Sequence, residues 1–190
     1  MESLRGVKKM DAQTNVTSTG QKIRTVDITV TAAMAALVFL GTYIFKIPTI
    51  SGYVHLGDCM ILLTVALFGM KKGAIAGAIG GGLSDFIGGY FYWVVPTLLI
   101  KCMWAIVMGL IMHKVLKDKK GSFLIGAIAG GVLHIIAYTL VRVVLYGGKT
   151  AIIEIPALAF QTGAGIVIGF VIYMLLKKSG VAGRLSGMVK

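Results

Sequence analysis

The chain has 190 residues, of which 57% are apolar and only 14% are charged. Soluble domains average about 45–50% apolar and about 25% charged residues, and here the apolar residues form long runs, which excludes an ordinary soluble fold. The net charge of +12 does not indicate a nucleic acid partner, because the basic residues form short clusters between the apolar runs. The composition therefore predicts a single membrane domain.

In chain order, residues 1–25 are polar and lack helical periodicity, so they are predicted to form a disordered cytoplasmic tail. A membrane-spanning helix takes roughly 20 apolar residues. Within a membrane domain at 26–178, the candidate spans are 28–45, 56–70, 74–90, 94–112, 123–146 and 155–176. The second is short, the third is rich in glycine, and a tight hairpin at Lys71 and Lys72 is predicted to join them. Residues 179–190 are predicted to be a second cytoplasmic tail.

Most of the 19 basic residues lie in the two tails and in the second and fourth connections between these spans. Lysine and arginine are retained on the cytoplasmic side of a membrane. Six spans place all four of these basic clusters on one side. The sequence therefore predicts an all-α integral membrane protein, a compact bundle of six transmembrane helices with both termini inside, in a multi-pass arrangement in the cell membrane.

Other ionisable groups are predicted to lie at or near the outer face. They are Lys46, His55, Asp58, Asp85, Lys101, Arg142, Lys149 and Glu154. An ionisable group within a membrane span is costly unless it is paired or faces a cavity. We therefore expect a polar hollow that opens to the exterior.

In the first span, Ala32 and Ala36 form a ridge of small residues near the cytoplasmic end. The ridge serves either internal packing or the docking of another membrane helix. In the second span, Asp58 lies in the first turn, where the helix dipole favours a carboxylate. His55 with Asp58 is too sparse for a metal site. Cys59 and Cys102 are interpreted as small packing residues, with a disulfide between them as the alternative.

The third span has Gly73 and Gly77 at the spacing of a close-packing motif. Gly82-Leu83-Ser84-Asp85 follows, and it weakly resembles the nucleophile sequence of intramembrane proteases. Asp85 stands where those enzymes have glycine, and the sequence places no histidine convincingly as a base. The sequence also contains neither an HExxH nor a Walker A motif. We therefore expect no catalytic residue, cofactor or metal, while a membrane enzyme using Ser84 or His134 and a membrane scaffold remain alternatives.

The fourth span is predicted to begin after Pro96, with Thr97, Lys101 and Trp104 on neighbouring positions. Lys101 lies more than a turn inside this span, so it needs a partner. Asp85, Glu154 and an anionic group on a ligand are the candidates.

Four aromatic residues, Tyr90-Phe91-Tyr92-Trp93, precede this helix. They form either an interfacial aromatic belt or a stacking wall for a flat ligand.

The fifth span carries a stripe at four-residue spacing that shares one helix face: Gly126, Gly130, His134, Tyr138 and Arg142. Its glycines allow close backbone contact toward the inner half, and its polar groups lie toward the outer half. Arg142 either extends to the outer headgroups or faces the hollow. His134 is either a neutral histidine bonded between helices or part of the site.

Together with the size and topology, three segments resemble the S components of the energy-coupling factor (ECF) vitamin transporters. They are the AxxxA sequence from Ala32 to Ala36, Gly-Tyr-Val-His-Leu-Gly-Asp at 52–58, and Pro-Thr-Leu-Leu-Ile-Lys at 96–101. The resemblance covers nearly the whole chain after the first tail. It implies a substrate-binding subunit that captures its vitamin from outside and topples in the membrane to release it inside.

The resemblance also implies the partners, which are a transmembrane coupling subunit docked at Ala32 and Ala36 and two cytoplasmic ATPases. By region, it implicates ten substrate-binding residues, namely Tyr53, His55, Asp85, Trp93, Lys101, Trp104, Tyr138, Arg142, Glu154 and Gln161. The aromatic residues favour a ring, and Lys101 and Arg142 would suit a carboxylate or a phosphate. We favour a hydroxymethylpyrimidine-like or pyridoxine-like ligand, with pantothenate and riboflavin as alternatives.

Overall fold

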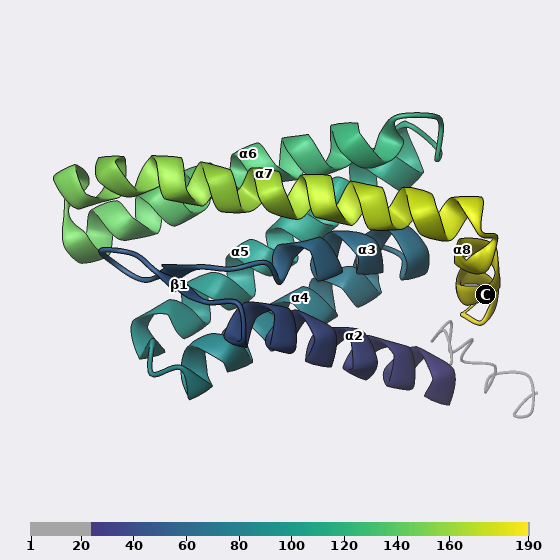
Figure 1. Ribbon diagram of the computed structural model, residues 1–190, viewed down its shortest axis with the longest axis horizontal. Helices are drawn as coiled ribbons and strands as arrows, with labels where there is room; N and C mark the ends of the chain where they lie inside the picture. The colour runs from purple at the N-terminus through teal and green to yellow at the C-terminus, as the bar shows by residue number, and fades with distance from the viewer. Residues whose placement is uncertain (1–23, 190) are drawn as a thin grey trace, which may run out of the picture.

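The computed structural model describes residues 24–189, which form a bundle of helices (Figure 1). Most of the predicted tail at 1–25 therefore lies outside the described residues. The helices are α2 (Thr25–Tyr43), α3 (Asp58–Phe68), α4 (Met70–Ile87), α5 (Phe91–Gly109), α6 (Ser122–Tyr146), α7 (Gly148–Lys178) and α8 (Val181–Gly187). The last turns of α5 continue as a π-helix, η1 (Leu110–Val115).

A helix lies in each of the six predicted segments. Within the described part of the chain, four helices are long and apolar enough to cross a membrane: α2, α5 continued by η1, α6 and α7. Helix α3 has only 11 residues, and α4 carries Lys71, Lys72 and Asp85. The all-helical membrane architecture is thus confirmed, while the count of six spans and the inward-facing termini stay predictions.

The helices pack in a continuous series. Helix α2 contacts α4, α4 contacts α5, α5 contacts α6 and α6 contacts α7, while α3 contacts both α4 and α7. Figure 1 shows α6 and α7 side by side along one edge of the bundle and α2 along the opposite edge, with α3, α4 and α5 between them.

Two of the connections are turns that depend on a single glycine. Gly69 joins α3 to α4 with φ of 92°, and Gly147 joins α6 to α7 with φ of 84°. Both angles lie in the left-handed region, which only glycine adopts without strain. The predicted hairpin between α3 and α4 is therefore present, but it turns at Gly69, and Lys71 and Lys72 lie in the first turn of α4.

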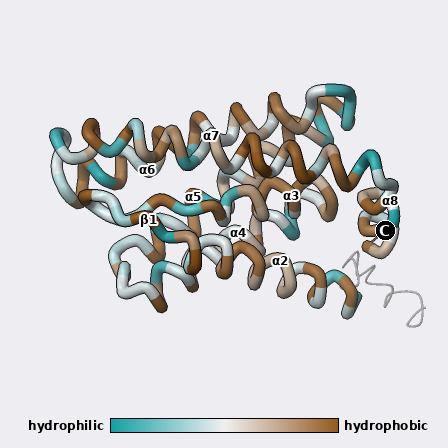
Figure 2. Tube along the Cα trace, in the orientation of Figure 1, coloured by the Kyte–Doolittle hydropathy of each residue, from teal (hydrophilic) through white to brown (hydrophobic). Residues whose placement is uncertain are grey.

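Both described ends of the chain lie at the same end of the bundle, which we call the inner end. The Arg24 side chain donates to the carbonyl of Met188 at 3.3 Å, and Lys72 Nζ lies 3.1 Å from Asp27 Oδ1. Figure 2 shows hydrophilic residues near the ends of the long helices α6 and α7, and mainly hydrophobic residues along the middle of each helix. This arrangement is the one expected for helices that pass through hydrocarbon.

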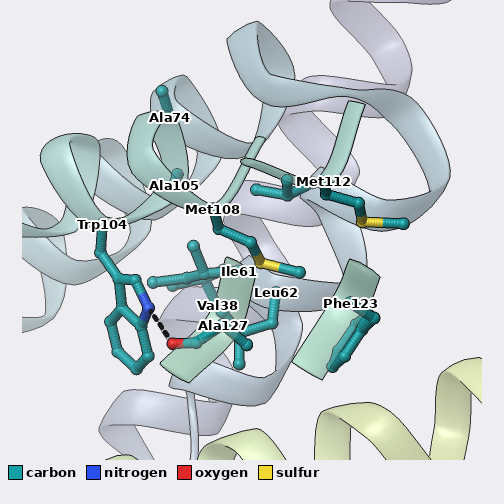
Figure 3. Close-up of a cluster of buried hydrophobic side chains, with 11 residues drawn as sticks. Val38, Ile61, Leu62, Ala74, Trp104, Ala105, Met108, Met112, Phe123 and Ala127 are labelled. Atoms are coloured by element: carbon teal, nitrogen blue, oxygen red, sulfur yellow. Dashed lines mark hydrogen bonds between the residues drawn. The ribbon is translucent and has the colours of Figure 1, made fainter. Parts of the chain in front are cut away.

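The inner half of the bundle is a close-packed apolar core, shown in Figure 3. Gly126 of α6 faces Met108, and Gly130 faces the ring of Trp104, so the two backbones approach closely. The Trp104 indole N–H donates to the carbonyl of Ala127 at 3.2 Å. The glycine half of the predicted stripe thus packs α6 onto α5.

The outer half is organised by the shortness of α3. At 1.5 Å per residue its 11 residues span about 16 Å, roughly half the hydrocarbon thickness. The connection 44–57 occupies the remaining depth, and it contains the short antiparallel strands β1 (Ile47–Pro48) and β2 (Tyr53–Val54). The start of α3 therefore lies inside the bundle, with Asp58 completely buried.

Two predicted helix starts were wrong. Helix α5 begins at Phe91, before Pro96, which removes only its own N–H from the helix ladder and is tolerated in membrane helices. Helix α7 begins at Gly148 rather than at 155, because the one-residue turn at Gly147 lets the helix start immediately. The segment 179–190 contains the short helix α8, and its cytoplasmic position stays a prediction.

Cys59 and Cys102 are both free, so no disulfide joins them.

Candidate functional site

A cavity of about 40 Å³ lies in the outer half, between the connection 44–57 and helices α4 to α7. Most of the predicted substrate-binding residues line it, namely Tyr53, His55, Asp85, Trp93, Tyr138, Arg142 and Gln161. The volume holds a few water molecules and no vitamin. The protein's own side chains thus largely fill the expected hollow, and a ligand of vitamin size requires the lining to move.

At the base of the cavity, Lys101 of α5 forms an ion pair with Asp58 of α3. The Gln161 amide N–H of α7 donates to the second oxygen of this carboxylate at 2.7 Å. The predicted protein partners of Lys101, Asp85 and Glu154, were therefore wrong. Asp58 pairs with it because the short α3 places its first turn at the depth of Lys101.

His55 lies on the connection 44–57, three residues before Asp58 of this ion pair. The backbone N–H of Gly57 donates to His55 Nδ1 at 3.2 Å. His55 Nε2 lies 3.5 Å from Lys101 Nζ and 3.5 Å from Gln161 Nε2. Because Nδ1 accepts the hydrogen bond from Gly57, it carries a lone pair, and the imidazole of His55 is neutral.

An aromatic wall lines one side of the cavity. The Trp93 and Tyr138 rings stack with centroids 5.6 Å apart, and the Tyr138 hydroxyl donates to Thr97 at 2.9 Å. Phe91 and Tyr92 instead face outward, with exposed fractions of 62% and 81%. The two interpretations of the aromatic cluster therefore apply to different residues. Trp93 faces the cavity, whereas Phe91 and Tyr92 are exposed, as residues of an interfacial belt would be.

Arg142 faces the bundle rather than the outer headgroups, so its predicted alternative of extending outward was wrong. Its guanidinium lies 5.2 Å from the centroid of the Trp93 ring. Its Nε donates to the Ser51 hydroxyl at 3.2 Å, and Nη2 lies 3.8 Å from Glu154 Oε2. The backbone N–H of Ser51 donates to Glu154 Oε1 at 2.9 Å. These contacts tie the connection 44–57 to α6 and α7, above the cavity.

A second attachment holds the same connection to α4. The Tyr53 hydroxyl donates to Asp85, and Lys46 Nζ lies 4.5 Å from the centroid of the Tyr53 ring and donates to the carbonyl of Ser84 at 3.3 Å. The connection is thus held by polar contacts on both sides of the cavity.

Three predicted site residues do not line the cavity. Lys101 lies beneath it in the ion pair, Glu154 lies behind Arg142, and Trp104 belongs to the apolar core. The sequence prediction missed Thr42, Gly52, Gly81, Thr97 and Leu158 as lining residues. Thr97 precedes Lys101 by four positions, so helical spacing was the available signal for that residue.

A second, mainly apolar hollow of about 320 Å³ lies beside the first. It lies between α7 and the connection 44–57, and its lining includes Phe45, Val54 and Phe160. His55 and Gln161 line both hollows, so these two side chains form the wall between them.

The candidate enzymatic residues have separate partners. The Ser84 hydroxyl lies 3.5 Å from the Tyr53 hydroxyl, whereas His134 Nδ1 lies 3.1 Å from the Thr162 hydroxyl. This geometry gives no support to a serine nucleophile with His134 as its base. His134 instead adopts the interhelical hydrogen bond that was its alternative interpretation.

The predicted docking ridge faces outward. Ala32 and Ala36 are exposed along α2, whereas Ala35 and Val38 on the opposite face are buried. Internal packing therefore does not explain the ridge.

Comparison with known proteins agrees with this arrangement. Residues 22–178 match the family model described as "ECF-type riboflavin transporter, S component". A protein of Pyrococcus woesei described as "Uncharacterized protein in gap 3'region" is 36% identical over 132 residues, which cover 70% of this chain and 87% of that protein. The family match spans the membrane helices, the cavity and the exposed ridge. The chain therefore belongs to the family of ECF-type S components, the vitamin-binding membrane subunits of these transporters.

Proposed function

We propose that this protein captures a small vitamin precursor with one aromatic ring at the cavity between the connection 44–57 and α4 to α7. The observation that carries the proposal is the convergence of aromatic and polar side chains from six parts of the chain on one cavity, namely α2, the connection 44–57 and helices α4 to α7. The paired rings of Trp93 and Tyr138 suit a flat ligand.

Size favours a single ring. A hydroxymethylpyrimidine or pyridoxine molecule needs less displacement of the lining than the three fused rings of riboflavin. The adjoining hollow supplies space if His55 and Gln161 move. Riboflavin, which the name of the matching family specifies, and pantothenate are the alternatives that a binding panel must separate.

Delivery would follow docking of the exposed α2 ridge on a transmembrane coupling subunit, with two cytoplasmic ATPases supplying the energy. Ala32 and Ala36 support this step because small residues let a partner helix approach closely. The charged inner end would then face the ATPases.

The test is to purify the protein, extract its ligand for mass spectrometry, and titrate the stripped protein with the four vitamins. We expect binding of a one-ring compound. Trp93→Ala should weaken that binding at least about tenfold, because it removes the stacking wall. Tyr92→Ala is the matched control, since Tyr92 is the adjacent aromatic residue and is 81% exposed. No retained vitamin and no binding across the panel would contradict the proposal.

A further inference from the structure

At the base of the cavity three hydrogen-bonding side chains meet, and neither Lys101 nor Gln161 offers an acceptor to the ring of His55. The backbone N–H of Gly57 points at His55 Nδ1, so this nitrogen must carry the lone pair. In a neutral imidazole the proton is then on Nε2. His55 therefore presents an N–H toward Lys101 and Gln161.

The two neighbours of His55 also present N–H groups. Asp58 fixes both of them, since one of its oxygens accepts from the Lys101 ammonium and the other from the Gln161 amide. These bonds orient the amide with its NH₂ group toward Asp58 and His55. At 3.5 Å, neither contact to His55 Nε2 can be a good hydrogen bond, because each joins two donors.

The charges around the cavity balance. Asp58, Asp85 and Glu154 supply three carboxylates, and Lys46, Lys101 and Arg142 supply three cations. All of these groups except the half-buried Lys46 are buried. Lys101 and Arg142 are thus already paired with carboxylates, and an anionic ligand would add an uncompensated charge to a buried region.

We propose that the cavity selects an uncharged heterocycle, whose ring nitrogen or carbonyl oxygen accepts hydrogen bonds from His55 and Gln161, which line the cavity above the Lys101–Asp58 ion pair. This inference rests on the proposed capture of a vitamin and narrows its substrate class. According to this inference, the balanced buried charges cause the cavity to reject ligands that carry a carboxylate or a phosphate. It also assigns His55 as a residue that determines specificity.

The first experiment measures binding of matched ligand pairs that differ in charge, by calorimetry on the purified protein. The pairs are hydroxymethylpyrimidine and its phosphate, pyridoxine and its 5′-phosphate, riboflavin and its 5′-phosphate, and panthenol and pantothenate. For the pair that binds, we expect the anionic member to be at least about 100-fold weaker, because an uncompensated buried charge costs several kcal/mol. Equal or tighter binding of the anionic member would overturn the inference.

A charge variant tests the cause of this discrimination. Glu154→Gln leaves the cavity with one excess positive charge, so the preference for the neutral member should shrink at least about tenfold. Asp27→Asn is the matched control, since Asp27 pairs with Lys72 at the inner end, and it should leave the ratio unchanged. If Glu154→Gln does not fold, Asp58→Asn makes the same change of charge. An unchanged ratio in a folded charge variant would contradict the role of the buried charges.

The donor part of the inference is tested on both partners. An analogue with the ring nitrogen replaced by C–H should bind at least about tenfold more weakly, and His55→Ala should remove this difference. His113→Ala is the control, because His113 contacts Val65 and Asp118 at the inner end. Equal binding of the two analogues by the unmodified protein would overturn this part. Failure of every vitamin to bind would instead overturn the proposed capture itself.

Discussion

The same helices form two halves of different character, an apolar close-packed inner half and a polar outer half that encloses a cavity. In the inner half, α6 places Gly126 and Gly130 against Met108 and Trp104, and the packing leaves the helices in direct contact. In the outer half, the same helix carries Tyr138 and Arg142, which face polar groups and a cavity. The difference shows that small residues let the inner helices pack directly, whereas the polar side chains of the outer half meet a connection that they hold in place.

The largest effect on stability is expected from breaking the buried ion pair. Lys101→Met leaves Asp58 charged and unpaired, which should cost about 3–5 kcal/mol of unfolding free energy. The double variant Lys101→Met with Asp58→Leu should recover most of this loss. Equilibrium unfolding in mixed detergent micelles measures both. A single variant as stable as the unmodified protein would show that the outer half does not depend on this pair.

A smaller loss is expected from crowding the inner half. In Gly130→Val the new side chain would collide with the Trp104 ring, at a cost of about 1–3 kcal/mol. Gly163→Ala is the matched control, because nothing lies within 4 Å of its added Cβ. The same unfolding measurement should find the control unchanged or up to about 1 kcal/mol more stable. Equal stability of both variants would refute the close packing of α5 and α6.

Between the two halves, Thr162 bonds the buried His134. Thr162→Val keeps the shape of the side chain but removes this hydrogen bond, so we expect a loss of about 1 kcal/mol. The unfolding free energy of Thr162→Val is compared with that of Thr139→Val, because Thr139 bonds only a carbonyl of its own helix. If both variants lose the same amount, the interhelical bond adds nothing measurable.

The smallest effect on the bundle is expected at the exposed ridge. Ala32→Leu with Ala36→Leu should leave stability and ligand affinity unchanged, because neither side chain packs inside the bundle. Uptake of the labelled vitamin should nevertheless stop in cells that supply the coupling complex. Ala159→Leu, an exposed alanine on α7, is the control and should transport normally. Normal uptake in the double variant would remove the ridge from the docking step.

Sequence patterns predicted where the helices lie and which of their faces matter. Runs of apolar residues located a helix in each of the six segments, and the four-residue spacing in α6 put Gly130 and Arg142 on one buried face. The family resemblance was confirmed by the match over residues 22–178. These features were accessible because apolar length and helical periodicity are local properties of the chain.

Tertiary structure decided which polar groups meet. Asp58 was interpreted as a favourable residue at a helix start, and only the short α3 brought it to Lys101. Arg142 pairs with Glu154 because the turn at Gly147 folds α7 directly back along α6. Sequence alone determined that ionisable groups had to be paired or face a cavity within the membrane. Their choice of partner depends on helix length and turn geometry, which bring together residues far apart in the chain.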